Sequence, residues 1–224
     1  MKKIFFVSVM ILLSSCFSEH KNAGSQAGWN IWEGRGNITV NENILLYEPV
    51  SFQDEEYDSD IEGRGPAAIA AKLIKGKKWT LDFRPVFLSN SHVFNRFTVG
   101  LWSGQKGKRP SLASKAARMT FALSKTRGPG SGDTILKITL KKGDVSQNIE
   151  LPGNARLFRF QREDSIVKFF YSTEYRPKFT EALSFTLDTN DPVYFTAGAR
   201  YDGKISGKPV MKLMQFTLDG KNFL

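Results

Sequence analysis

The chain has 224 residues, of which 41% are hydrophobic and 12% aromatic, and it contains a single cysteine. This composition is typical of a folded globular domain, and it excludes a disordered chain, a disulfide framework and a cysteine zinc site. The formal charge is +10, but the Lys and Arg residues are scattered along the sequence, so we do not expect nucleic acid as a partner.

The first residues have the pattern of a bacterial lipoprotein signal. Two lysines precede the apolar run Ile4–Leu13, which is too short for a bilayer span of roughly 20 residues. The motif Leu13-Ser-Ser-Cys16 resembles a lipobox, in which small residues precede the cysteine that is acylated. We therefore expect residues 1–15 to be a signal peptide and Cys16 to carry the palmitate-type lipid that binds the bilayer. The alternative is an ordinary secretory signal with a chance cysteine.

The next segment is small, polar and without periodicity. We interpret residues 16–28 as the lipidated cysteine followed by a flexible tether, and residues 29–224 as one domain. Phe17, and not Asp, follows the cysteine, which by the sorting rule of enteric bacteria resembles an outer-membrane lipoprotein. We expect a lipid-anchored protein of the cell envelope, at the outer membrane.

The acidic stretch Asp54–Glu62 is the sharpest cluster of ionisable residues. In an extended chain its even-numbered members from Glu56 onward share one face, roughly 6.6 Å apart at i and i+2. That spacing suits the carboxylate pair of a glycoside hydrolase, with separations of about 5–5.5 Å or about 6.5–9.5 Å. Asp58, Asp60 and Glu62 are therefore an alternative catalytic set or, because Ca²⁺ prefers carboxylate oxygens, an alternative Ca²⁺ site. A solvated acidic loop is the interpretation we favour, with no cofactor.

The rest of the sequence consists of short runs of period two, rich in β-branched and aromatic residues and separated by Gly, Pro, Asn and Asp. This pattern predicts many strands in an all-β sandwich or barrel. One segment, Pro66–Lys75, fits a short helix as well as a strand, because Pro starts it and Gly follows it. The runs that we expect to form strands are 97–102, 118–123, 135–140, 157–161, 167–171, 183–187, 193–199 and 210–218.

Two stretches resemble a known family. Gly65–Phe83, in which Gly76 precedes Trp79-Thr-Leu-Asp-Phe83, is similar to an early strand pair of concanavalin A-like (laminin G-like) jelly-roll domains. Phe158–Thr173 resembles the hairpin of the same domains, although Glu174-Tyr-Arg-Pro177 replaces the usual Asp-Gly after it. The resemblance implies an all-β fold, a two-sheet antiparallel jelly-roll sandwich, and it favours a strand in Pro66–Lys75.

The resemblance also bears on catalysis. Laminarinase-type enzymes of this fold carry a Glu-x-Asp-x-(x)-Glu strand in mid-chain. Here Asp58-x-Asp60-x-Glu62 has Asp in the place of the nucleophile and lies early in the chain, which argues against an enzyme. A serine triad is also poorly supported, because His92 is the one histidine of the expected domain and there is no Gly-x-Ser-x-Gly motif.

Residues opposite the predicted core are the candidates for ligand binding. Alternation places Trp102, Arg118, Arg159 and Gln161 on the faces that point away from the core, with Trp29, Trp32 and Trp79 inside it. An exposed Trp among Arg and Gln suits a sugar, since the ring covers an apolar face and the polar groups bind hydroxyls. The alternative is that Trp102 completes a second buried face.

The sequence therefore predicts non-catalytic binding of a carbohydrate or another envelope ligand. The alternatives are a glycoside hydrolase that uses the carboxylates of Glu56–Glu62, and a structural or adhesive protein that binds another protein. An exposed Trp102 on a concave sheet favours the first of the three.

Overall fold

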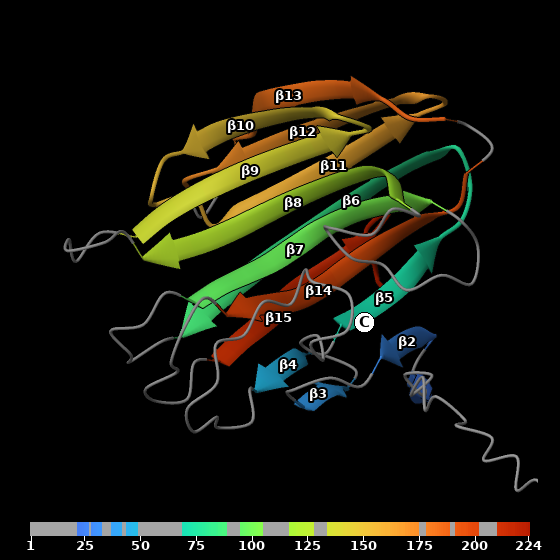
Figure 1. The fold of residues 1–224 in the computed structure, drawn as a ribbon, viewed down its shortest axis with the longest axis vertical. Coiled ribbons are helices and arrows are strands. Elements are labelled where there is room, and N and C mark those ends of the chain that lie inside the picture. The colour runs from blue at the N-terminus through green and yellow to red at the C-terminus, as the bar shows by residue number, and fades with distance from the viewer. Residues whose placement is uncertain are drawn as a thin grey trace, which may run out of the picture.

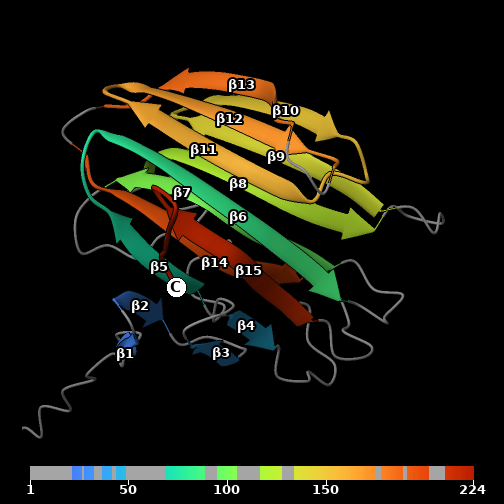
Figure 2. The ribbon, with the colours of Figure 1, turned by 180° about the vertical axis from the view of Figure 1, so that it is seen from behind.

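The computed structural model describes residues 22–26, 28–32, 37–41, 44–48, 69–88, 95–104, 117–127, 134–174, 178–188, 191–201 and 210–224. Within these ranges the regular elements are all β-strands, and the strands form two antiparallel sheets that lie face to face (Figures 1 and 2). None of the described residues belongs to a helix long and apolar enough to cross a membrane. The predicted all-β, two-sheet antiparallel architecture is confirmed.

Sheet 1 runs from the N-terminal strands to a solvent-exposed hairpin. Its strands, in spatial order, are β1 (Asn22–Gln26), β2 (Trp29–Trp32), β5 (Ile69–Ile74), β14 (Val193–Tyr201), β7 (Asn95–Gly104), β8 (Ala117–Arg127), β9 (Thr134–Lys142) and β10 (Val145–Leu151). The central strand β14 lies between β5 and β7, so segments far apart in the sequence are hydrogen-bonded neighbours (Figure 1).

Sheet 2 is centred on β6, which is its longest strand. Its strands, in spatial order, are β13 (Thr180–Thr186), β12 (Ile166–Ser172), β11 (Leu157–Glu163), β6 (Lys78–Leu88), β15 (Val210–Leu218), β4 (Leu45–Glu48) and β3 (Asn37–Val40), and β16 (Lys221–Asn222) pairs with β15. The β11–β12 hairpin is the one that the sequence resemblance indicated.

Every run predicted to be a strand coincides with a strand of the structure, except that Leu187 lies just beyond β13. The ambiguous segment is a strand where it is described, since Ile69–Ile74 forms β5. Strand β10 was missed because its first four residues are all exposed, and period-two alternation is visible only when one face is buried. As an edge strand, β10 is held by its pairing with β9.

The sheet begins earlier than the predicted domain boundary at Trp29. Asn22–Gln26 lies within the range expected to be a flexible tether, but it forms β1 and pairs with β2. Small polar residues have weak strand propensity, so no strand is predicted from residues 22–26 alone. The backbone hydrogen bonds to the edge of β2 decide the structure. Residues 1–21, which include the predicted signal and Cys16, lie outside the described residues.

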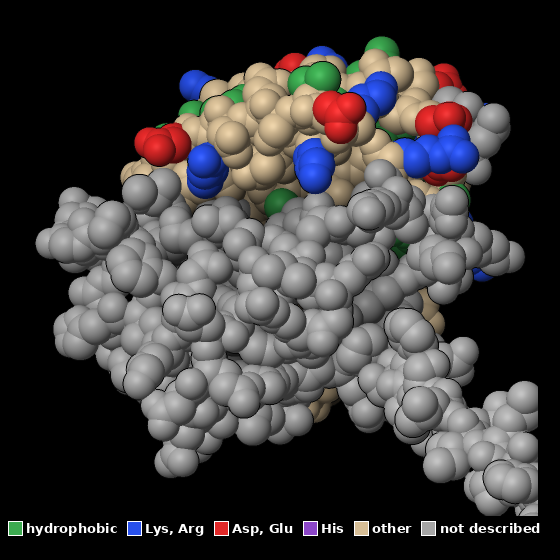
Figure 3. Space-filling view, viewed as in Figure 1, with side chains coloured by type: hydrophobic (Ala, Val, Ile, Leu, Met, Phe, Trp, Pro, Cys, Tyr) green, Lys and Arg blue, Asp and Glu red, His purple; other side chains and the backbone are tan. Residues whose placement is uncertain are grey.

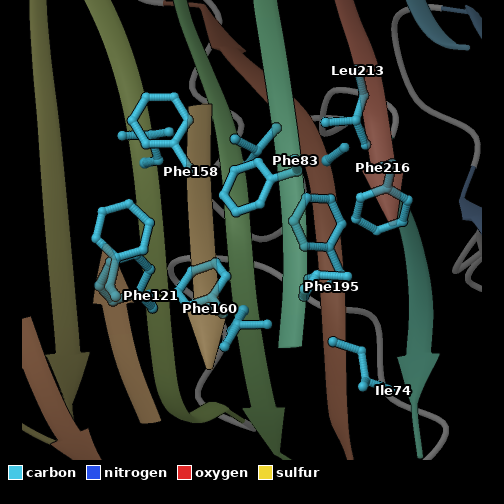
Figure 4. Close-up of a cluster of buried hydrophobic side chains, with 14 of the residues drawn as sticks. Ile74, Phe83, Phe121, Phe158, Phe160, Phe195, Leu213 and Phe216 are labelled. Atoms are coloured by element: carbon cyan, nitrogen blue, oxygen red, sulfur yellow. The ribbon is translucent and has the colours of Figure 1, made fainter. Parts of the chain in front are cut away.

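The core between the sheets is dominated by phenylalanine (Figure 4). Phe121 of sheet 1 lies 4.9 Å from Phe160 of sheet 2 between ring centroids, and Phe195 lies 5.2 Å from Phe83 in the same way. Fully burying one such ring stabilises the fold by roughly 1.5–3 kcal/mol. The core positions predicted for Trp29 and Trp79 are confirmed, while the Trp32 side chain lies outside the description.

Candidate ligand-binding face

The four predicted ligand-binding residues do not form one site. Trp102 and Arg118 lie on β7 and β8 of sheet 1, whereas Arg159 and Gln161 lie on β11 of sheet 2. All four point away from the core, and the outer faces of two stacked sheets look in opposite directions. The structure therefore separates the set into two pairs, one on each side of the sandwich.

The predicted exposure of Trp102 is wrong. Its side chain is only 1% exposed, although it lies on the outer face of sheet 1 and outside the main core cluster. The ring packs 5.8 Å from that of Tyr194, its cross-strand neighbour on β14. Ala71 and Ala122 are buried on the same face. The alternative in which Trp102 completes a second buried face agrees with this geometry.

Arg118 is engaged in ion pairs. Its guanidinium lies 3.4 Å from Asp188 and 3.4 Å from Asp191, both in the segment between β13 and β14. The Asp191 contact is an ion pair without hydrogen-bond geometry, since Asp191 Oδ2 has no hydrogen-bond partner. With a side chain that is 61% exposed, Arg118 ties this segment to the start of β8 through weak, solvent-screened contacts.

Arg159 lies in a more ordered environment on the outer face of sheet 2. Its Nε and Nη2 atoms donate hydrogen bonds of 2.6 and 2.8 Å to the two oxygens of Asp82, its cross-strand neighbour on β6. The ring of Phe179 lies 4.0 Å from the guanidinium carbon. The hydrogen bond to Asp82 raises the pKa of Arg159. The guanidinium plane of Arg159 is therefore held along one edge by Asp82 and on one face by Phe179. Its Nη1 atom takes no part in the hydrogen bonds to Asp82.

Polar and aromatic side chains surround this pair, and we call the set the Arg159 face. Gln161 is exposed and lies opposite Thr80 of β6, while Phe170 of β12 lies directly opposite Arg159. The three strands that carry the face are side by side and turned toward the viewer in Figure 2. The Arg159 face consists of Thr80, Asp82, Arg84, Arg159, Gln161, Lys168, Phe170 and Phe179.

A cavity of about 260 Å³ opens at one end of the Arg159 face. It exists because β6 runs past the end of β11: the last registered pair is Phe83 with Phe158, and Pro85–Leu88 pair only with β15. A turn closed by the Ala155 N–H donating to the Pro152 carbonyl faces the gap. The lining residues are Arg84, Pro85, Val86, Leu136, Gly153, Asn154, Ala155, Arg156 and Phe158.

The alternative catalytic or Ca²⁺ residues Asp58, Asp60 and Glu62 lie outside the described residues, as does His92. Within the described ranges no group of three or more His, Cys, Asp or Glu is arranged to hold a metal ion. On the Arg159 face, Asp82 binds Arg159, and Lys168 lies 3.0 Å from Glu181 of β13. Two ion pairs therefore lie on this face, and Thr80 and Gln161 add a hydroxyl and an amide group.

Sequence reasoning missed Asp82, Arg84 and Phe179 as members of this face. Asp82 and Arg84 alternate with the core residues Leu81 and Phe83, so period two alone assigns them to the outer face. Their meeting with Arg159 depends on the register of β6 with β11, which joins residues 77 positions apart. Phe179 lies outside any strand and had no periodic signal.

Comparison with solved structures identifies the architecture. The chain is similar to the CBM2 module of the evolved Dit of Lactobacillus casei BL23 phage J-1, with a TM-score of 0.55, 11% identity, and coverage of 89% of this chain and 93% of that chain. The chain has the concanavalin A-like β-sandwich fold. A legume lectin-like domain from Entamoeba histolytica shares it, with a TM-score of 0.53, 10% identity and coverage of 85% and 89%.

A third structure with this concanavalin A-like sandwich is the exoplasmic/lumenal domain of VIP36 in its Ca²⁺- and Man3GlcNAc-bound form. Its TM-score is 0.50, with 12% identity and coverage of 85% of this chain and 84% of that chain. No protein-family model and no curated protein matches the sequence. At these identities the likeness establishes the fold, which hosts many functions, so function has to be argued from the Arg159 face itself.

Proposed function

We propose that this concanavalin A-like protein is a non-catalytic carbohydrate-binding lipoprotein of the cell envelope, anchored at the outer membrane through Cys16. The observation that carries the proposal is the Asp82–Arg159 pair fixed beneath Phe179 on the outer face of sheet 2. Support also comes from the fold, which the chain shares with a lectin-like domain and with a saccharide-bound domain.

The chemistry of the Arg159 face fits a sugar. A carboxylate accepts hydrogen bonds from hydroxyl groups, and a guanidinium and an amide donate them, so Asp82, Arg159 and Gln161 supply both kinds of partner. Phe170 offers an apolar ring for the C–H face of a pyranose. Because Asp82 and Arg159 hold each other in place, little side-chain entropy is lost on binding, and preorganisation of this kind raises affinity.

The same face favours binding over catalysis. Glycoside hydrolysis needs two carboxyl groups with separate roles, an acid and a base or nucleophile. Of the carboxylates described on or beside this face, Asp82 binds Arg159 and Glu181 binds Lys168. A hydrolase that uses Asp58, Asp60 and Glu62 remains the alternative, and hydrolysis of any glycan that binds would support it.

A glycan array with the full chain in detergent micelles tests the proposal. We compare the wild type with Arg159→Ala and with Arg118→Ala, which removes an arginine paired with Asp on the outer face of the other sheet. We expect Arg159→Ala to weaken binding roughly tenfold or more, and Arg118→Ala to leave it unchanged. Absence of binding by the wild type, or an equal loss in both variants, overturns the proposal.

The lipid anchor has its own test. Metabolic labelling with an alkyne palmitate analogue is expected to mark the wild type and not Cys16→Ser. After a high-salt wash, which removes proteins held only by charge, the wild type should remain with the membrane fraction and the variant should not. A variant that still sediments with salt-washed membranes contradicts the anchor, whatever the glycan array shows.

A further inference from the structure

Apart from the short β16, each described sheet ends in two strands that have a neighbour on one side only. These edge strands are β1 and β10 in sheet 1, and β13 and β3 in sheet 2. An edge strand presents unpaired backbone N–H and C=O groups, which can pair with another chain unless the edge is short or distorted. Strands β1 and β13 pair with their neighbours in an interrupted register, and β3 has only four residues. Strand β10 has none of these safeguards.

Strand β10 is long, regular and exposed. Its seven residues, Val145–Leu151, pair with β9 without a break in register. They include no Pro, Lys or Arg, which are residues that commonly block edge-to-edge pairing. The first four residues of the strand are exposed, and Val145 is 72% exposed. The free side of β10 therefore offers a regular template to a further strand.

The apolar residues of β10 share the face that points toward the core. Leu151 is buried there, and Ile149 packs against the core cluster. Alternation places Val145 on the same face, but at the far end of the strand this side chain stays exposed. A strand added to the free edge covers it, because directly opposite Cβ atoms of neighbouring strands lie about 4.5–5.5 Å apart.

The sequence of β10 is complementary to itself. When two copies pair antiparallel about a two-fold axis at Asn148, the middle residue of the strand, every residue of both strands is paired. Val145 of one copy then lies opposite Leu151 of the other, so the exposed apolar side chain gains an apolar neighbour. A contact in which both copies use the same surface closes on itself, and this is the commonest form of homodimer.

The charges beside this edge are complementary in the same register. Glu150 of one copy lies opposite Ser146 of the other, and Ser146 pairs with Lys141 across the β9–β10 ladder. Opposite charges therefore meet two strands apart, with backbones separated by roughly 10 Å, which two long side chains can span. Over β9 and β10, Lys and Arg side chains are interspersed with Asp and Glu on the described surface (Figure 3), so no block of one charge opposes the approach of a second copy.

We infer that β10 is a dimerisation edge, through which two copies of the chain pair antiparallel along Val145–Leu151 and join their copies of sheet 1 into one continuous sheet. The seam is one strand wide and about 24 Å long. This lies at the small end of specific interfaces, so we expect a dissociation constant of about 1–100 μM. Strand β1, which begins the described chain, is at the opposite edge of sheet 1, so an anchor at the N-terminus leaves β10 accessible.

Dimerisation through β10 has a consequence for the Arg159 face. The two-fold axis is perpendicular to the joined sheet, so it leaves the outer faces of both copies of sheet 2 on the same side. Two Arg159 faces then point in one direction, and two linked sites raise the apparent affinity for a repetitive ligand by about 10²–10⁴. This consequence rests on the proposed carbohydrate-binding function, whereas the dimer itself does not.

Sedimentation equilibrium of the full chain, in micelles of a density-matched detergent, tests the dimer. We expect the protein mass to rise from one copy to two as the concentration passes through the micromolar range. Val145→Lys places a charge on the inner face of the seam, as natural edge strands do to prevent pairing, and should raise the dissociation constant tenfold or more. Ile166→Lys is the matched control, since Ile166 is also an exposed apolar residue but lies in sheet 2. It should dimerise as the wild type does.

Three results overturn the inference: a wild type that stays monomeric up to about 1 mM, a dimer that Val145→Lys leaves unchanged, and a dimer that both variants weaken equally. No glycan takes part in this experiment. A monomeric wild type therefore leaves the carbohydrate-binding proposal standing, and absence of glycan binding on the array leaves the dimer standing.

Disulfide cross-linking in membranes tests the register. The two copies of Asn148 lie opposite each other at a Cα separation of about 4.5–5.5 Å, which a disulfide can bridge. The two copies of Ser146 are displaced along the strands by roughly 13 Å, which a disulfide cannot bridge. We expect copper-phenanthroline oxidation to give a covalent dimer with Asn148→Cys and at least tenfold less with Ser146→Cys, which is exposed on the same face of β10. The wild type controls for cross-linking by Cys16.

The cross-linked products also identify the occupant of the edge. A disulfide-linked dimer of Asn148→Cys alone supports the two-fold pairing. Equal cross-linking of Asn148→Cys and Ser146→Cys shows random collision, and an adduct of Asn148→Cys with a different protein shows that another partner uses the edge. Either of these results overturns the pairing of two copies through β10.

Discussion

Asp82 and Arg159 face each other across β6 and β11 and are joined by two hydrogen bonds of 2.6 and 2.8 Å. Farther along the same strand pair, Lys78 and Glu163 are also cross-strand neighbours, but their charged atoms lie 3.6 Å apart and their side chains are 84% and 68% exposed. The two pairs lie on the same two strands and each joins opposite charges, but they differ in geometry and burial. This contrast separates an ordered bidentate ion pair from an ordinary surface ion pair.

A double-mutant cycle measures that difference. For Asp82→Ala and Arg159→Ala we expect a coupling free energy of about 1 kcal/mol, at the upper end for partly exposed pairs, because the contact is bidentate and two-thirds buried. For Lys78→Ala and Glu163→Ala we expect coupling close to zero. Urea denaturation of the four single and two double variants gives both values. Equal coupling in the two cycles contradicts the ordered geometry of the Asp82–Arg159 pair.

Most of the fold followed from alternation in the sequence. Residues 157–161 illustrate why: Phe158 and Phe160 are buried in the core, and Arg159 between them faces outward. Period two fixes the face of each side chain because consecutive side chains of a strand point in opposite directions. The same holds on β8, where Met119 and Phe121 are buried and Arg118 next to them is exposed.

The candidate site could be predicted only in part, because alternation does not say which strands become neighbours or whether an outer face is solvated. Arg159 and Gln161 were assigned to an outer face correctly, and their role as ligand-binding residues stays a prediction. Trp102 was assigned to an outer face as well, but there the face is buried. The register that brings Asp82 to Arg159 depends on long-range packing, which no local pattern in the sequence records.

Adding a side chain at Gly100 is expected to disrupt the packing of β7 against β8. A Cβ atom added there lies 1.8 Å from the carbonyl oxygen of Phe121 on the neighbouring strand β8, so a backbone must move. We expect Gly100→Ala to lower the free energy of unfolding by roughly 1–3 kcal/mol, as overpacking does, or more. Gly143→Asn is the control, because nothing lies within 4 Å of that position and Asn tolerates its positive φ of 57°. Similar midpoints in urea for both variants contradict the close approach.

The partly buried phenol of Tyr194 is expected to make the free energy of unfolding depend on pH in the alkaline range. Burial raises the pKa of its phenol above the ordinary value of 10.0. The folded protein then retains a proton that the unfolded chain has lost, so this contribution to stability is complete below pH 10 and is lost as the pH rises through the folded-state pKa. Tyr194→Phe should therefore lose less stability than the wild type across this range.

The measurement is urea denaturation of both proteins below and above pH 10, with phenolate absorbance recorded alongside. Burial lowers the pKa of Lys72, which adds stability with rising pH up to 10.5, but this contribution is common to both proteins and cancels in their difference. The wild type should show a late-titrating phenol that is missing from the variant. Identical pH profiles of stability would mean that Tyr194 titrates as a solvated phenol.

Substitutions of Trp102 distinguish a role of this side chain in packing from a role in ligand binding. Because its side chain is 1% exposed, Trp102→Ala should lower the free energy of unfolding by about 3–5 kcal/mol, as truncation of large buried rings does. The indole Nε1 has no hydrogen-bond partner in the described structure, so Trp102→Phe gives up part of the packing and no hydrogen bond, at a cost of roughly 1–2 kcal/mol. Urea denaturation measures both costs.

The folded Trp102→Phe variant should then bind glycans as the wild type does, since the Arg159 face lies on the other sheet. A Trp102→Phe protein of near-native stability that has lost glycan binding would move the sugar site to sheet 1.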